Sequence, residues 1–168
     1  HHMRAFKAFF IAMLATAGAT AAAAQQAPLT ERVNGYDLMI PAERPAMLRA
    51  AGFVFEGDRV LNRCNLPVNF SATNPPSVII RDVNGDGRTE ALLRDTGSCY
   101  DPDGDFFAII AKGPDGQWKL LLDGLGIVRM VAPGYQGWPD AEVQLAGACK
   151  PLYRWNGERY AAVMTCKK

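Results

Sequence analysis

The amino-acid sequence predicts a mainly β domain of antiparallel strands, arranged as a meander or a small sandwich, with one short N-terminal helix. Three observations predict this fold: ten short apolar runs, turn residues between the runs, and four cysteines. The runs have the length of ordinary strands, and Gly, Asn, Asp or Pro separates them. Such a succession is typical of antiparallel sheets linked by disulfides.

The N-terminal segment is expected to lie outside the folded domain. His1 and His2 precede the first methionine and are interpreted as a tag remnant. Residues 3–24 then place two positive charges, an apolar stretch and small residues ending at Ala24 in the order of a secretory signal peptide. The alternatives are an alanine-rich helix of the domain, or a membrane anchor, for which the apolar stretch is short against the roughly 20 residues a bilayer needs. We expect a single periplasmic or secreted domain over 25–168, without a membrane span after cleavage.

The first elements of this domain are a strand and a helix. Residues 36–40 are expected to be extended, and residues 43–52 to form the helix. Pro45 suits the first turn of a helix and Gly52 suits its end. The apolar side of this helix consists of Met47, Leu48 and Ala51.

The ten apolar runs are expected to form the strands that follow. They cover residues 53–56, 59–62, 77–81, 90–95, 106–112, 118–123, 127–131, 141–145, 152–155 and 159–163. Hairpin turns are indicated at 113–116 and 156–157. The runs 106–111 and 119–123 are too apolar for a sheet with one wetted face, so both are expected to be central strands.

The four cysteines, Cys64, Cys99, Cys149 and Cys166, indicate two disulfides if the chain is exported. A zinc site is the alternative, although the chain has no CxxC pair and no histidine after residue 2. Three pairings are possible. If the two strands flanking a two-residue turn at 156–157 pair residue by residue, Cys149 and Cys166 lie just beyond them, two residues out of register. A slight irregularity in the pairing would let these two cysteines form a disulfide. Cys64 would then pair with Cys99.

Residues 82–90 carry the strongest chemical signal. Oxygen-bearing side chains at positions 1, 3, 5 and 9, with glycine at position 6 and a backbone carbonyl at position 7, can wrap around Ca²⁺. These positions are held by Asp82, Asn84, Asp86, Gly87, Arg88 and Glu90. Leu93 stands at position 12, where an EF-hand needs a bidentate Glu, so this is not an EF-hand loop. The alternative is a tight turn with solvated acids and no metal.

This loop resembles the calcium loop of FG-GAP and integrin-type repeats, in which the acid at position 9 closes the site between two strands. The resemblance implies Ca²⁺ as cofactor. A closed propeller is not expected, because four to eight blades need more strands than residues 25–168 supply. Over 76–163, the segments DVNGDGRTEALL, GSCYDPDGDFFAII, GWPDAEVQL and RWNGERY resemble an uncharacterised family of secreted proteobacterial proteins. That resemblance implies an envelope location and no particular reaction.

Composition excludes several classes of function. Without Arg4 and Lys7 the chain has 16 basic side chains against 17 acidic ones, which gives no attraction to nucleic acid or anionic lipid. Since histidine is confined to the first two residues, a Ser-His-Asp triad, a Cys-His pair and an HExxH zinc site are excluded.

A second acidic turn and two aromatic residues are candidates for a binding surface. Asp101, Asp103 and Asp105 repeat the 1, 3, 5 spacing, but the glycine and the closing acid are missing, so a solvated turn is the alternative to an ion site. Tyr135 and Trp138 lie in a Gly- and Pro-rich loop, where exposed rings would suit a glycan or protein partner. Packing in the core is the alternative role for such rings.

The sequence therefore favours a non-enzymatic, Ca²⁺-stabilised binding or interaction module of the cell envelope, for example an inhibitor or immunity-type protein. The rival function is a carboxylate-based hydrolase acting on glycans, with acids such as Asp103, Asp140 or Glu142 in catalytic roles.

Overall fold

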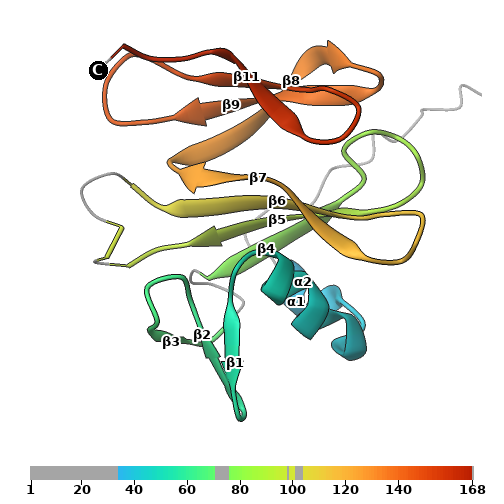
Figure 1. Cartoon of the computed structure of the whole chain (residues 1–168), viewed down its shortest axis with the longest axis vertical. Helices are drawn as coiled ribbons and strands as arrows, with labels where there is room; N and C mark the ends of the chain where they lie inside the picture. Colours follow the sequence, from blue (N-terminus) through green and yellow to red (C-terminus); the bar gives the residue numbers. More distant parts are fainter. Residues whose placement is uncertain (1–33, 71–75, 98, 101–103, 168) are drawn as a thin grey trace, which may run out of the picture.

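A computed structural model describes residues 34–70, 76–97, 99–100 and 104–167. The expected tag and signal peptide lie outside these residues. The described chain forms eleven strands in three antiparallel sheets, none closed into a barrel or propeller (Figure 1). The mainly β prediction is confirmed. No helix in the described part of the chain is long and apolar enough to cross a membrane.

The central sheet has the order β4-β5-β6-β7. Its strands are β4 (Ser77–Arg81), β5 (Glu90–Asp95), β6 (Phe106–Lys112) and β7 (Trp118–Leu125). The turn 113–116 joins β6 to β7, as the sequence predicts. Strand β6 is central and buried along nearly its whole length, which confirms the prediction for 106–111.

The prediction that 119–123 form a central strand is wrong, because β7 is an edge strand of its sheet. Beyond β7 the chain turns at Gly126 into the outer sheet rather than adding a neighbour to the central one. Gly126 has φ +125°, and a Cβ there would come within 2.7 Å of the Gln144 carbonyl oxygen. Only glycine fits this corner, where the chain passes between sheets.

The outer sheet has the order β11-β10-β9-β8. Its strands are β8 (Ile127–Tyr135), β9 (Trp138–Gln144), β10 (Leu152–Trp155) and β11 (Tyr160–Met164). Strands β8 and β9 both extend beyond the apolar runs at 127–131 and 141–145. The reason is a pairing of Tyr135 with Trp138 across their turn, after a register irregularity in β8.

Two helices, a 3₁₀ turn and a small sheet cover the other face of the central sheet (Figure 1). These elements are α1 (Gly35–Leu38), η1 (Pro41–Glu43), α2 (Arg44–Ala50), β1 (Val54–Glu56), β2 (Arg59–Leu61) and β3 (Pro67–Val68). Helix α2 agrees with the predicted helix, and the chain leaves it at Gly52 with φ +87°. Strands β1 and β2 agree with the predicted runs at 53–56 and 59–62, whereas β3 has no counterpart in the sequence prediction.

The expected strand at 36–40 is wrong, because its first residues belong to helix α1. Asn34 caps this helix: its Oδ1 accepts from the Tyr36 N–H at 3.1 Å and from the Val78 N–H at 2.9 Å. One side chain therefore both starts the helix and attaches it to β4. The alternation of apolar residues does not reveal such a long-range cap.

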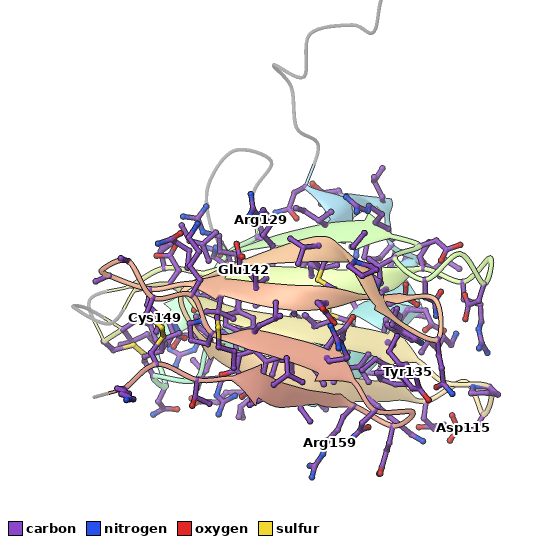
Figure 2. All side chains as sticks on the ribbon, turned by 90° about the horizontal axis from the view of Figure 1, so that it is seen from above. Asp115, Arg129, Tyr135, Glu142, Cys149 and Arg159 are labelled. Atoms are coloured by element: carbon purple, nitrogen blue, oxygen red, sulfur yellow. A yellow bond between two sulfur atoms is a disulfide. The ribbon has the colours of Figure 1, made fainter. Side chains whose placement is uncertain are left out.

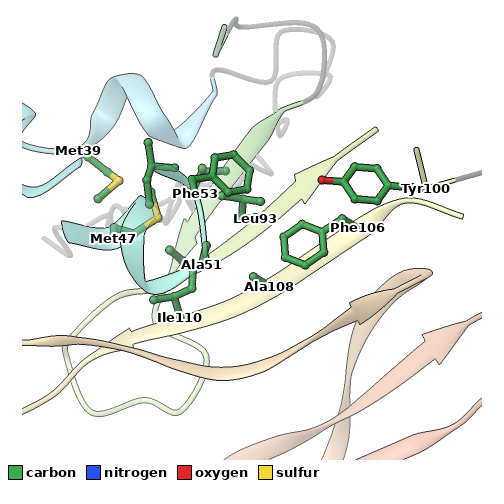
Figure 3. Close-up of a cluster of buried hydrophobic side chains, with 12 residues drawn as sticks. Met39, Met47, Ala51, Phe53, Leu93, Tyr100, Phe106, Ala108 and Ile110 are labelled. Carbon is green, nitrogen blue, oxygen red and sulfur yellow. The ribbon is translucent and has the colours of Figure 1, made fainter. Parts of the chain in front are cut away.

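The two faces of the central sheet carry separate hydrophobic cores. The helix-side core, shown in Figure 3, joins α2 to β4, β5 and β6. Its largest fully buried side chains are Met47, Leu48, Val78, Leu93 and Ile110. The outer-side core lies against the outer sheet and contains Ile109, Ala111, Leu121, Ala141 and Tyr160. The molecule is thus a three-layer arrangement with the central sheet in the middle.

Both disulfides have the expected pairing, Cys64–Cys99 and Cys149–Cys166. The two-residue turn used to derive this pairing is wrong, because Trp155 pairs with Tyr160 and residues 156–159 form a four-residue loop. The longer loop, together with a register shift between Leu152 and Tyr153, leaves the Cα atoms of Cys149 and Cys166 5.8 Å apart. In Figure 2, Cys149 lies at one end of the molecule, and Tyr135 and Asp115 lie at the other.

Candidate metal centre

The loop 82–89 connects β4 to β5 in the central sheet, where Arg81 pairs with Glu90. The two carboxylate oxygens of Asp82 accept from the Gly85 N–H at 2.7 Å and from the Gly87 N–H at 2.8 Å. Gly85 and Gly87 have φ of +74° and +83°, which glycine adopts without strain. Asp82 therefore holds the loop curled around its own side chain.

Two further side chains continue this pattern. Asn84 Oδ1 accepts from the Asp86 N–H at 3.1 Å, and Asp86 Oδ1 accepts from the Arg88 N–H at 2.8 Å. The bond from the Arg88 N–H is the main cause that lowers the pKa of Asp86. Asp86 is therefore ionised at neutral pH. Its other oxygen accepts from Arg88 Nη2 at 3.2 Å, so a cation already stands beside it.

Glu90 differs from the other acids of the loop because it is buried, with 2% of its surface exposed. Ala91 and Leu93 belong to the helix-side core, so alternation along β5 turns Glu90 toward the outer sheet. Its Oε2 accepts from the Val83 N–H at 2.8 Å. Burial, with smaller contributions from the charges of Asp86 and Asp82, raises the pKa of Glu90 to about 6. A nearby positive charge would favour its ionised form.

The outer sheet closes over this end of the loop. A Cβ at Gly137, in the β8–β9 turn, would lie 3.3 Å from the Asn84 carbonyl oxygen. The pKa of Tyr160 is raised, chiefly by burial and then by the charges of Glu90 and Asp140. Its hydroxyl donates to the Pro139 carbonyl at 2.8 Å. The loop is thus in contact with the second sheet as well as with its own strands.

The donor chemistry of the loop fits a hard cation, since the ligand atoms it offers are all oxygens. Asp82, Asn84 and Asp86 each use an oxygen to accept from the loop backbone, and Glu90 accepts from Val83. Each such oxygen keeps a second lone pair for a metal. In the described residues, however, no three acid, His or Cys side chains are gathered as a finished ligand set. Binding would need these side chains to draw together.

Of the residues expected at a binding surface, the structure describes Asp105, Tyr135 and Trp138. Asp101 and Asp103 lie outside the described residues, and Asp105 is ion-paired with Arg94. Tyr135 is 51% exposed at the β8–β9 turn. Trp138 is half-buried and stacks on Trp155, with ring centroids 4.3 Å apart. Of the two rings, Tyr135 alone is open to a partner.

Of the acids considered for hydrolysis, Asp103 lies outside the described residues, and Asp140 and Glu142 are paired with arginines. Both oxygens of Asp140 accept from Arg154, at 2.9 and 2.8 Å, and Asp140 is 3% exposed. Glu142 accepts from Arg129 at 2.8 Å. These contacts engage both oxygens of Asp140 and one oxygen of Glu142, so neither carboxylate is presented free to a substrate.

Sequence reasoning missed the fully buried Asp95. Its Oδ2 accepts from Asn62 Nδ2 and from the Tyr100 hydroxyl, both at 2.9 Å, while Oδ1 has no hydrogen-bond partner. Burial raises the pKa of Asp95, and these two hydrogen bonds oppose the shift. A signal was present, since Asp95 continues the alternation of Ala91 and Leu93 toward the helix-side core.

Comparison with protein-family models, with curated proteins and with solved structures finds no match for this chain.

Proposed function

We propose that this protein is a non-enzymatic binding or interaction module of the periplasm or cell exterior, stabilised by Ca²⁺ in the loop 82–90. The observation that carries the metal site is the buried Glu90 at the end of a loop with two further carboxylates. Ca²⁺ would neutralise these acids and fix the β4–β5 hairpin against the outer sheet. Asp82, Asn84, Asp86 and Glu90 would provide side-chain oxygens, and Arg88 its carbonyl.

The location rests on the two disulfides and on the signal-like segment 3–24. Disulfides persist in oxidising compartments, and both pairs, Cys64–Cys99 and Cys149–Cys166, are formed in this fold. An inhibitor or immunity-type protein is one specific form of this function.

The ion pairs of Asp140 and Glu142 favour a binding role over glycan hydrolysis by these two acids. Asp140 and Glu142 are each neutralised by an arginine, as described above. A glycosidase needs one carboxyl that keeps a proton and a second one at a suitable separation across an accessible cleft. Turnover of any member of a glycan panel, lost in Glu142→Gln, would overturn this preference.

The calcium site is tested by thermal unfolding in 10 mM Ca²⁺, in 10 mM Mg²⁺ and in EDTA. For a Kd of 10⁻⁴ to 10⁻³ M, Ca²⁺ should stabilise the fold by about 1 to 3 kcal/mol and raise the Tm by several degrees. Asp86→Ala should abolish this rise. Asp58→Ala, in the exposed β1–β2 turn, is the matched control and should keep it. Equal Tm values in Ca²⁺ and EDTA would leave the loop as a metal-free turn.

A further inference from the structure

A cleft of about 560 Å³ lies between the α1–η1 segment, the loop 82–90 and the β6–β7 turn. Leu38 and Ile40 line it and are 69% and 70% exposed, more than any other large hydrophobic side chain in the described residues. Ile80 and Trp118 line it as well. Exposure of large aliphatic side chains to water is unfavourable, and a cluster of them around a cleft is typical of a binding surface.

The polar groups of the cleft are arranged around Glu43. Its carboxylate accepts from Lys112 Nζ at 3.0 Å and from Trp118 Nε1 at 2.8 Å. These two hydrogen bonds, with Lys112 the larger cause, lower the pKa of Glu43. The charges of Glu43 and Lys112 therefore satisfy each other. The remaining cation on the cleft wall is Arg88, which lies in the candidate calcium loop.

Arg88 connects the cleft to the metal site. In this structure its guanidinium donates to Asp86 Oδ2 at 3.2 Å. Ca²⁺ would compete for the same carboxylate and so weaken the hold of Asp86 on Arg88. It would also neutralise the acids of the loop, which otherwise repel a negatively charged ligand from this wall.

We propose that this cleft binds a short peptide segment of a partner protein, consisting of a large apolar side chain flanked by carboxylates, and that Ca²⁺ strengthens the binding. This inference rests on the calcium site proposed above. The apolar side chain would pack against Leu38, Ile40 and Trp118, and a neighbouring carboxylate would pair with Arg88. The two ligands bind at separate positions, so each should raise the affinity of the other by the same factor.

The chemistry of the cleft selects this occupant. Its aliphatic and indole side chains offer a surface for an apolar anchor, which supplies most of the binding energy of a short peptide. A basic peptide would find no unpaired acid on the wall, because Glu43 is held by Lys112 and Trp118. The preference for acid flanks thus comes from Arg88, and the dependence on Ca²⁺ from Asp86.

Trp118 provides a direct readout by NMR, since its indole N–H lies in the cleft, whereas Trp138 and Trp155 pack in the outer sheet. The probe is acetyl-Asp-Asp-Phe-Asp-Asp-amide, and the control is acetyl-Lys-Lys-Phe-Lys-Lys-amide. We expect the acidic peptide to shift the Trp118 indole signal saturably, with a Kd about fivefold or more lower in Ca²⁺ than in EDTA. The Trp138 and Trp155 signals should stay in place.

Variants separate the parts of this proposal. Ile40→Ser should raise the Kd of the acidic peptide about tenfold. Ile127→Ser, at a 52% exposed position outside the cleft, should leave this Kd unchanged. Arg88→Gln should remove the preference for acid flanks. In Glu90→Gln, which replaces a charged loop ligand by a neutral amide, the effect of Ca²⁺ on the peptide Kd should be largely lost. A Ca²⁺ effect that persists in Glu90→Gln would come from the peptide itself and would overturn the linkage.

The experiments distinguish an error in the cleft proposal from an error in the calcium-site proposal. If Ca²⁺ raises the Tm but neither peptide shifts the Trp118 signal at millimolar concentration, the cleft proposal is wrong and the calcium site stands. Equal binding of the two peptides would also overturn it. If Ca²⁺ leaves the Tm unchanged, the calcium site and the linkage are wrong, while saturable binding of the acidic peptide in EDTA would still support the cleft.

Discussion

The two faces of the central sheet are packed by chemically different layers. On the helix side, α2 and the small sheet cover an aliphatic and aromatic core in which Met47, Leu48 and Ile110 are fully buried (Figure 3). On the outer side, Ile109 and Leu121 share the layer with Tyr160, and buried Glu90 lies at the end next to the candidate metal loop. Each face therefore buries one acid of β5, Asp95 on the helix side and Glu90 on the outer side, and only Glu90 belongs to the candidate metal loop.

The largest expected difference between the faces is in the free energy of unfolding that is lost when one of two adjacent residues of β6 is replaced by alanine. Ile110 belongs to the helix-side core and Ile109 to the outer-side core, and both are 0% exposed. Ile110→Ala should cost about 3 to 5 kcal/mol, and Ile109→Ala about 2 to 3 kcal/mol, measured by urea unfolding. The smaller loss is expected on the outer side because its partly buried neighbours Leu122 and Met130 can move toward the cavity.

Ile79→Ala is the control for this pair, since Ile79 is 55% exposed on β4. This substitution should change the free energy of unfolding by no more than about 0.5 to 1 kcal/mol. An equal or larger loss for Ile109→Ala would show that the outer-side core is packed as rigidly as the helix-side core.

The disulfides also lie on opposite sides of the central sheet. Cys64–Cys99 spans 35 residues beside the helix-side core, and Cys149–Cys166 spans 17 residues in the outer sheet. Replacing either pair by serine should cost about 2 to 4 kcal/mol, because the unfolded chain gains conformational freedom. The loss should be about 0.6 kcal/mol larger for the longer loop. Urea unfolding of the two double variants measures this difference, and a larger loss for Cys149–Cys166 would contradict the chain-entropy explanation.

The smallest expected changes in the free energy of unfolding come from substitutions of two acids at opposite ends of β5. Glu90 faces the outer sheet, and Asp95 faces the helix side. Burial raises the pKa of Glu90 from 4.5 to about 6, so in EDTA the folded protein loses stability as pH rises through this window. Glu90→Gln should remove that loss and stabilise the fold at pH 7 by about 1 to 2 kcal/mol. In Ca²⁺ the order should reverse, because the variant lacks the negative charge of a metal ligand.

Asp95→Asn is the matched variant on the other face. The pKa of Asp95 is raised from 3.8, so its contribution to stability also declines as pH rises above that value. Its effect should be the same in Ca²⁺ and in EDTA, since its partners are Asn62 and Tyr100 rather than the loop. Thermal unfolding of both variants between pH 4 and pH 8 checks this, and a Ca²⁺-dependent effect of Asp95→Asn would contradict the separation of the two faces.

Local signals in the sequence were sufficient for most of the strands, for the hairpin turn at 113–116 and for helix α2. Alternating apolar residues and turn residues act over a few positions, so they predict β6, the turn 113–116 and α2 correctly. They were insufficient for 36–40, where a cap from Asn34 to β4 replaces the expected strand with helix α1. The pairing of the cysteines was predicted correctly although the loop 156–159 is longer than assumed.

The sequence was sufficient to predict the loop of the candidate metal site, but not the surroundings of that loop in the fold. The spacing of Asp82, Asp86 and Glu90 is visible in the sequence. The burial of Glu90 is not, because it requires a second sheet to cover that face of β5. The cleft is not visible in the sequence either, because Leu38, Trp118 and Arg88 come from segments that are distant along the chain.

The sequence by itself determined the antiparallel β character, the two disulfides and the oxygen-rich loop, since turn geometry, side-chain alternation and cysteine number are local or compositional properties. Only the tertiary structure decided that β7 is an edge strand and that the chain crosses at Gly126 into a separate sheet. Sheet membership depends on contacts between residues far apart in the chain, and these contacts bury Glu90 and bring Arg88 to the cleft wall.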